Sequence, residues 1–323
     1  MKKIIKKILL IVFLTLIQKF GFAELIYVSN EKDHNMSVID GDSLEVIKTV
    51  KVGHRPRGII LSKDKKKIII CTSDDNRIAV VDVASLEIDY YLPSGPDPEL
   101  MVMDDSGKFI YVANEDDNMV TVVDYVGKKI VKEIPVGVEP EGMGLSPDGK
   151  TLVNTSETTN MAHFIDTDTL EIKANVLVDA RPRVAQYSAD GKFVWVSSEI
   201  GGTISIIDSA KLQIIKKIEF SIPGLSKESI QPVGVRLDEK RQLAYVALGP
   251  ANRIAIINMK TYEVEKYILT GQRVWNLMIN SNGTKLYTTN GVSNDISVID
   301  IDKRKVIKSI PVGRYPWGVA IKE

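Results

Sequence analysis

The chain has 323 residues, of which 44% are hydrophobic and 26% are charged, with 42 basic and 42 acidic side chains. This length can hold one large domain or two ordinary ones, and the balanced charge argues against a nucleic-acid partner, which favours a basic surface. The only cysteine, Cys71, excludes an intrachain disulfide, so the fold must be held by packing. Because Cys71 ends the apolar run Ile68–Cys71, we expect a buried and unreactive thiol.

The first 23 residues have the pattern of a secretory signal peptide. Residues 1–7 are basic, residues 8–17 form an apolar run, and Gly21-Phe22-Ala23 is a small-residue cleavage site. The alternative, an uncleaved anchor, is less favoured because the apolar run is too short to span a bilayer comfortably. Cleavage would remove five lysines and no acid, leaving 37 basic and 42 acidic residues. We therefore expect a periplasmic or secreted protein with no membrane span after cleavage, whose single domain is residues 24–323.

This domain contains seven copies of one repeat. Each copy has two apolar residues before an Asp or Asn, at Asp40, Asp82, Asp124, Asp166, Asp208, Asn258 and Asp300. A second anchor keeps the same phase, at Pro56, Pro98, Pro140, Pro182, Pro232, Val274 and Pro316. Successive copies are 42 residues apart, except for one step of 50. The extra eight residues fall between Asp208 and Pro232, where they form either a lid or contact loop or a tolerated insertion.

Each copy predicts four short strands joined by tight turns. Asp-Gly or Asn-Gly between apolar runs, as at Asp148-Gly149, is a strong hairpin signal. The second hairpin carries a turn-forming asparagine at Asn76, Asn118, Asn160, Asn252 and Asn294. A period of about 40 residues with such strands is typical of a β-propeller, here all-β with seven blades of four antiparallel strands. Because residues 24–323 begin at a second-type strand, we expect the C-terminal strand 316–321 to complete that first blade and close the ring.

Several segments resemble a known repeat family. Tyr27-Val28-Ser29-Asn30, Tyr111-Val112-Ala113-Asn114 and Ser146-Pro147-Asp148-Gly149-Lys150 are similar to the YVTN-type β-propeller repeat, and the resemblance covers all of residues 24–323. With its leader and seven units, the chain most resembles exported propellers associated with pyrroloquinoline-quinone (PQQ)-dependent alcohol catabolism. The resemblance implies a non-catalytic periplasmic accessory protein, with a quinoprotein dehydrogenase or a cytochrome c as partner and PQQ as a candidate ligand. It implies no resident cofactor, and we expect a monomer.

The residues that flank the anchoring prolines are expected to meet at one mouth of the central channel. They include five arginines and two tryptophans that together could bind an anionic, aromatic ligand: Arg55, Arg57, Arg181, Arg183, Arg273, Trp275 and Trp317. The mouth also carries Asp97, Glu99, Glu139 and Glu141. The alternative is therefore that the arginines only pair with neighbouring acids and that the tryptophans fill gaps between blades.

Metal binding and catalysis have weaker signals. His34 and His54 lie in loops expected on the same face, but two histidines without a third ligand make a weak metal site. No nucleophile elbow, phosphate loop or His-Glu-x-x-His motif occurs. A lactonase-like hydrolase with a site at the channel mouth stays open as the alternative function, because seven-bladed lactonases share the expected fold.

Overall fold

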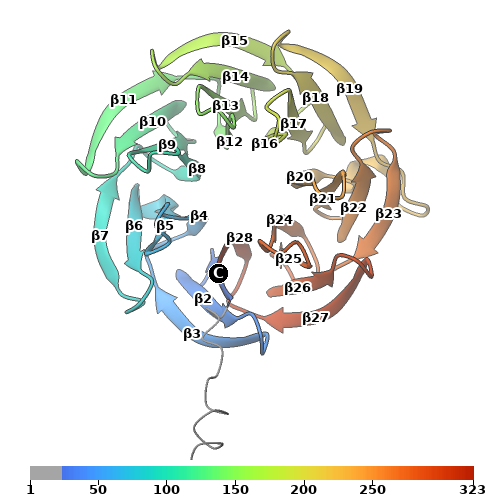
Figure 1. Ribbon diagram of the computed structural model, residues 1–323, viewed down its shortest axis with the longest axis horizontal. Helices are drawn as coiled ribbons and strands as arrows, with labels where there is room; N and C mark the ends of the chain where they lie inside the picture. The colour runs from blue at the N-terminus through green and yellow to red at the C-terminus, as the bar shows by residue number, and fades with distance from the viewer. Residues whose placement is uncertain (1–23) are drawn as a thin grey trace, which may run out of the picture.

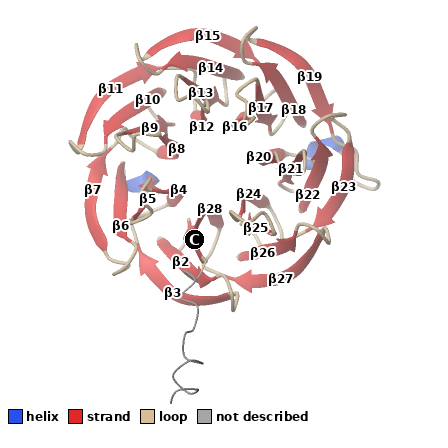
Figure 2. Ribbon diagram, viewed as in Figure 1, coloured by secondary structure: helices blue, strands red, loops and turns tan. Residues whose placement is uncertain are grey.

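The computed structural model describes residues 24–323 as a ring of seven four-stranded antiparallel sheets around a central axis (Figure 1). This confirms the predicted seven-bladed β-propeller. The signal-peptide prediction for residues 1–23 lies outside the described residues. Two short 3-10 turns, Ser73–Asp75 and Lys227–Ser229, are the only helical segments between residues 24 and 323 (Figure 2). No helix in that range has the length and apolar character needed to cross a membrane.

The blades follow one another along the chain, and each runs from the innermost to the outermost strand. The first three complete blades contain β4 (Pro56–Leu61), β5 (Lys67–Thr72), β6 (Arg77–Asp82) and β7 (Ile88–Pro93); β8 (Pro98–Met103), β9 (Phe109–Asn114), β10 (Met119–Asp124) and β11 (Lys129–Pro135); and β12 (Pro140–Leu145), β13 (Thr151–Ser156), β14 (Met161–Asp166) and β15 (Glu171–Leu177).

The next three blades repeat this order. They contain β16 (Pro182–Tyr187), β17 (Phe193–Ser198), β18 (Thr203–Asp208) and β19 (Gln213–Glu219); β20 (Pro232–Asp238), β21 (Leu243–Leu248), β22 (Arg253–Asn258) and β23 (Val264–Leu269); and β24 (Val274–Ile279), β25 (Lys285–Asn290), β26 (Asp295–Asp300) and β27 (Lys305–Pro311).

The remaining blade is built from both ends of the described chain. It contains β1 (Leu25–Asn30), β2 (Asn35–Asp40) and β3 (Glu45–Lys51), with β28 (Pro316–Lys322) as its innermost strand. β28 pairs antiparallel with β1, with Tyr27 opposite Ala320. Trp317 of β28 is only 1% exposed. The predicted ring closure is therefore confirmed.

The two middle strands of each blade are buried on both faces, because every sheet is packed between two neighbouring sheets. Hydrophobic clusters form between adjacent blades, as where Trp195 of β17 joins Val235 of β20 and Val246 of β21. Such double-sided burial explains the continuous apolar runs in the sequence, for example Ile68–Cys71 in β5. Cys71 is fully buried, as expected.

The repeated turn residues have the predicted role. Asp40 accepts hydrogen bonds from the backbone N–H groups of Asp42 and Ser43, and Asp166 does the same for Asp168 and Thr169. The five repeated asparagines all have left-handed backbone angles, with φ between 53° and 61°. Asparagine tolerates this region better than most residues, which explains its use in these hairpins.

The eight extra residues lie in the loop between β19 and β20. The backbone N–H of Ser221 donates to the Tyr267 hydroxyl on β23, an outermost strand. In Figure 1 the loop projects at the outer edge of the ring beside β23. It therefore does not cover the central axis, which leaves a contact loop or a tolerated insertion as its role.

Candidate functional site

One mouth of the channel is formed where the innermost strands begin and the second strands end. Antiparallel pairing brings these two chain ends together in each blade, as where Pro98 of β8 lies opposite Asn114 of β9. The residue before the proline, the residue after it and the residue after the second strand therefore gather at the same place. We call the charged residues gathered here the charged mouth: Arg55, Arg57, Arg181, Arg183, Arg273, Glu31, Asp97, Glu99, Glu115, Glu139, Glu141, Glu157 and Glu199.

Five residues that precede the first residue of an innermost strand, which is Val274 in one blade and a proline in the other four, are held in a strained conformation. Arg55, Asp97, Glu139, Arg181 and Arg273 have φ between 48° and 59°, a region costly for residues other than glycine. Each backbone N–H donates to a side chain of the preceding blade, usually the turn asparagine. Arg273 N–H, for instance, donates to Asn252 Oδ1 at 2.8 Å. The asparagines thus have a second role, which is to orient the mouth residues of the next blade.

All five predicted arginines lie in this mouth, and each contacts carboxylates. Arg55 Nη1 lies 2.6 Å from Asp97, and Arg57 Nη1 lies 2.8 Å from Glu99. The other pairs are Arg181 with Glu157 at 2.7 Å and with Glu199 at 3.1 Å, Arg183 with Glu141 at 2.9 Å and with Glu157, and Arg273 with Glu199 at 2.6 Å. The structure therefore brings the predicted residues together, but with acidic partners already in place.

Arg183 is the most enclosed arginine of the charged mouth. Its side chain is 5% exposed, and it reaches Glu141 and Glu157, which are themselves nearly inaccessible. Burial lowers the pKa of Arg183, but the surrounding carboxylates raise it above its usual value. For Glu157, burial dominates over Arg183 and raises the pKa to about 8. This part of the mouth is thus a desolvated ion network rather than a set of free charges.

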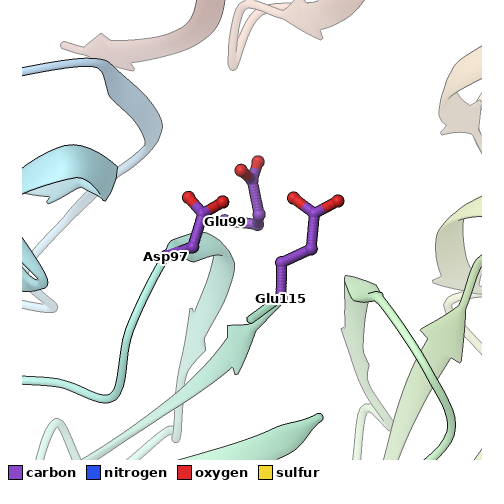
Figure 3. Close-up of side chains that lie close together, drawn as sticks. All are labelled: Asp97, Glu99 and Glu115. Atoms are coloured by element: carbon purple, nitrogen blue, oxygen red, sulfur yellow. The ribbon is translucent and has the colours of Figure 1, made fainter. Parts of the chain in front are cut away.

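The acidic residues outnumber the arginines. Eight carboxylates that are buried or half-buried face five guanidinium groups. Asp97, Glu99 and Glu115 form one group with carboxylate oxygens within 4.8 Å of one another, and Figure 3 shows their side chains directed to a common point. Glu115, Glu139 and Glu157 form a second such group. Glu115 belongs to both groups and makes no ion pair with any residue from 24 to 323.

Burial, and after it the repulsion between neighbouring carboxylates, raises the pKa of acids in these groups. Burial raises the pKa of Glu99 well above its usual range, against the lowering effect of Arg57. Burial and the nearby Glu141 also raise the pKa of Glu115. A divalent cation or a basic group of a partner would relieve this repulsion.

The two predicted tryptophans are covered by arginines. Arg57 stacks over Trp317 with its Cζ atom 5.2 Å from the ring centroid, and Arg273 stacks over Trp275 at 4.3 Å. The indole N–H groups of both tryptophans are buried without an acceptor in the described part of the chain. The ring faces can therefore stack on a ligand only where these arginines move aside.

The weak metal candidates are engaged in other contacts. His34 and His54 lie edge to face with ring centroids 5.0 Å apart. His34 Nδ1 accepts a hydrogen bond from the Arg55 backbone N–H at 3.1 Å, and His54 Nδ1 lies 2.8 Å from Asp75. His34 occupies the repeat position of the turn asparagines, and like them it accepts the hydrogen bond from the backbone N–H of the mouth residue in the next blade. Within residues 24–323, neither histidine belongs to a group of three possible metal ligands.

Four acids of the charged mouth were not expected from the residues that flank the prolines. Glu31, Glu115, Glu157 and Glu199 each directly follow a second strand. Glu115, Glu157 and Glu199 are separated by the repeat step of 42 residues, and Glu31 precedes Glu115 by two such steps. The same position holds Ser73, Gly249 and Gly291 in the other blades. This periodicity is a signal that could have revealed them.

Comparisons with known proteins agree on the fold. A family model described as the cytochrome D1 heme domain matches residues 64–185. No curated protein matches the chain. Hydrazine synthase from Kuenenia stuttgartiensis is a similar solved structure, with 21% identity, a TM-score of 0.78, and coverage of 85% of this chain and 91% of that one.

Two further solved structures have a similar fold. A candidate 6-phosphogluconolactonase from Bacteroides fragilis has 18% identity and a TM-score of 0.79, with coverage of 94% of this chain and 99% of that one. The dihydro-heme d1 dehydrogenase NirN has 16% identity and a TM-score of 0.69, with coverage of 91% and 74%. At these identities the likeness shows the fold alone. The chain is a β-propeller protein.

Proposed function

We propose that this chain is an exported, non-catalytic binding protein, accessory to a redox enzyme, which receives its partner at the charged mouth. The observation that carries the proposal is the surplus of carboxylates there, centred on the unpaired Glu115. Desolvated charges that are fixed by a rigid scaffold give specificity and faster association with a partner of opposite charge. The proposal therefore requires a basic patch on the partner, such as the lysine-rich face of a c-type cytochrome.

The exported location rests on the sequence of residues 1–23, and the redox association rests on the resemblance to PQQ-associated propellers. The names of two similar proteins, a heme domain and a heme d1 dehydrogenase, also belong to redox systems. Haem iron is usually held by His, Cys, Met or Tyr. Here His163 uses both ring nitrogens for hydrogen bonds within its blade region, and Cys71 is fully buried. Neither His163 nor Cys71 therefore offers a free axial ligand for haem iron, and in our proposal the redox centre belongs to the partner.

Titration of the purified mature chain with a basic c-type cytochrome tests the proposal. We expect association that weakens as salt is added, and a several-fold slower association rate for Glu115→Gln. Glu133→Gln is the matched control, because Glu133 is exposed on the outermost strand β11. The absence of binding, or equal rates for the two variants, would contradict docking at the mouth.

A narrower version places PQQ on the arginine and tryptophan arc formed by Arg55, Arg57, Arg181, Arg183, Arg273, Trp275 and Trp317. The three carboxylates of PQQ would have to replace Glu99, Glu157 or Glu199 as partners of the arginines. The unsatisfied indole N–H groups of Trp275 and Trp317 favour this version, since a ligand carboxylate could accept from them. Calorimetry with PQQ tests it, and equal affinity for wild type and the Arg55→Ala, Arg181→Ala double variant would exclude it.

A lactonase-like hydrolase is the second candidate. The two groups of carboxylates that share Glu115 favour it, because such groups can hold a divalent cation. Burial also raises the pKa of Glu157 to about 8, which would suit a general acid or base. A panel of lactones, assayed with and without a chelator, separates the two functions. Turnover that is lost with the chelator and with Glu115→Gln would favour the enzyme.

A further inference from the structure

Arg236 differs from every arginine of the charged mouth. It lies on the innermost strand β20, and the one hydrogen bond of its side chain within residues 24–323 runs from Nη1 to the backbone carbonyl of Val235 at 2.8 Å. No ion pair joins it to a carboxylate of residues 24–323. Burial alone acts on its proton affinity and lowers its pKa to about 10, whereas carboxylates raise the pKa of Arg57 and Arg183. By solvent accessibility Arg236 is half-buried, so its guanidinium is only partly removed from water, and a charge held there without a counterion is unfavourable.

The repeat places Arg236 deep in the channel. It stands four residues after the anchoring proline of its blade, and the same position in the other blades holds Ile60, Val102, Gly144, Gln186, Met278 and Ala320. Gln186 and Arg236 are thus the only polar side chains at this level. The charged residues after the prolines stand three positions earlier, which corresponds to about 10 Å along a strand.

A cavity of about 310 Å³ lies beside Arg236. Six innermost strands contribute to it, and its lining includes Ile60, Leu100, Met143, Gln186 and Met278 but no acidic residue. It extends to Pro147 and Ser188, which follow the ends of β12 and β16. It therefore opens toward the mouth opposite the charged one. An adjoining groove of about 260 Å³ shares Ile60 and Met278 and continues the apolar surface along β24 and β28.

We propose that this end of the channel binds an amphipathic anion, a carboxylate with an apolar body, whose charged group pairs with Arg236. The apolar side chains of the cavity would cover the body of the ligand, and Arg236 would supply the counterion and a bidentate donor. No donor among residues 24–323 reaches the buried Oε1 atom of Gln186, so this atom could accept a hydrogen bond from a hydroxyl on the ligand. This site is separate from the charged mouth and does not depend on the function proposed for it.

Decanoate, a ten-carbon carboxylate, is a suitable probe for the purified mature chain. We expect it to bind in calorimetry and to raise the midpoint of thermal unfolding, as any ligand of the native state does. The uncharged 1-decanol and the cationic decyltrimethylammonium ion have the same chain length, and we expect both to bind much more weakly. This comparison needs no variant, so it remains decisive even where a substitution affects folding.

The variant Arg236→Gln reproduces the residue that the neighbouring blade carries at this position. Loss of a charge-assisted pair should weaken decanoate binding by at least about tenfold. Arg253→Gln is the matched control, because Arg253 lies in the same blade and also donates only to a backbone carbonyl, that of Ala251. Glu115→Gln should bind decanoate as wild type does, which separates this site from the charged mouth.

Three results would overturn the proposal: no binding of decanoate, equal binding of decanoate and 1-decanol, or equal affinity of Arg236→Gln and Arg253→Gln. The first would leave Arg236 as an arginine solvated by water in the channel. The second would show an apolar cavity without an anion site. The third would place the bound decanoate elsewhere on the protein.

Discussion

Arg273 pairs with Glu199 at 2.6 Å although a whole blade lies between the blades that carry them. The intervening blade supplies Gln231 and Gly249, where most other blades carry a charged residue and a glutamate. Arg273 Nη1 donates to Gln231 Oε1 at 2.9 Å, and a Cβ atom on Gly249 would lie 3.7 Å from the guanidinium. The charged mouth is therefore a network in which some ion pairs join blades that are not neighbours in the ring. Its stability therefore depends on closure of the whole ring.

Replacing Arg183 by leucine should destabilise the fold strongly. The substitution leaves Glu141 buried without its partner and Glu157 with Arg181 alone, and breaking a buried ion pair in this way typically costs about 3–5 kcal/mol. Urea unfolding measures the change. Arg314→Leu is the control, because its pair with Asp33 is exposed and should contribute less than about 1 kcal/mol. Similar losses for both variants would show that the mouth network is not desolvated.

The contribution of Glu99, Glu115 and Glu157 to stability should fall as the pH rises from about 5 to about 8. Burial raises the pKa of Glu157 to about 8 and also raises the pKa of Glu99 and Glu115 above the unfolded value. The native state then binds more protons than the unfolded state, so this contribution is present at low pH and is lost as the pH passes the folded pKa. For each such group the slope is at most about 1.4 kcal/mol per pH unit.

Unfolding of Glu157→Gln across the same pH range isolates one of these groups. A glutamine resembles the protonated carboxyl, so the variant should show a shallower loss of stability with pH than wild type. Glu133→Gln on the exposed outer strand should keep the wild-type slope. An unchanged slope in Glu157→Gln would mean that Glu157 is already ionised in the native state at low pH.

Deleting residues 314–323 should abolish cooperative folding. The deletion removes β28, which supplies the inner strand of the first blade and buries Trp317, Val319 and Ala320. It also exposes the edge of β1 and leaves the ring open. Circular dichroism and size-exclusion chromatography of the shortened chain measure the effect. A shortened protein that melts like the full one would refute the closure of the ring by its two ends.

Cys71 should be inert to thiol reagents in the native protein. It is fully buried in β5, and burial raises the pKa of its thiol well above the usual value, which lowers the thiolate fraction. Labelling with a chromogenic disulfide should therefore require unfolding, and its rate should follow the urea concentration. Rapid labelling without denaturant would indicate local opening of this blade.

The repeat made the architecture predictable from sequence. The repeat step, which is 42 residues except for one step of 50, places the counterparts of Asp40 and of Pro56 at equivalent points of every blade. Strand pairing then brings the residues that flank the prolines to one mouth. The same step identifies His34 as a substitute for the turn asparagine. The ionic partners were harder to predict, because Arg273 reaches Glu199 through the rotamer of a long side chain and the small size of Gly249. No local pattern records such a contact.

The lack of a carboxylate partner for Arg236 was equally hard to predict from the sequence. A single arginine in an apolar strand gives no sign of whether a carboxylate lies opposite it in the ring. That depends on the absence of acids from six other innermost strands at the same depth. The repeat alignment identifies the equivalent positions in those six strands, but it can be used in this way only once the strand that lines the channel is known.

Hydrogen–deuterium exchange of residues 24–323 with and without a basic c-type cytochrome tests the central claim most directly. We predict protection in residues 97–99, 115–118 and 139–141, which carry the surplus carboxylates of the charged mouth, and its loss at high salt. Protection confined to the outer strands, or no protection at any salt concentration, would contradict docking at this mouth.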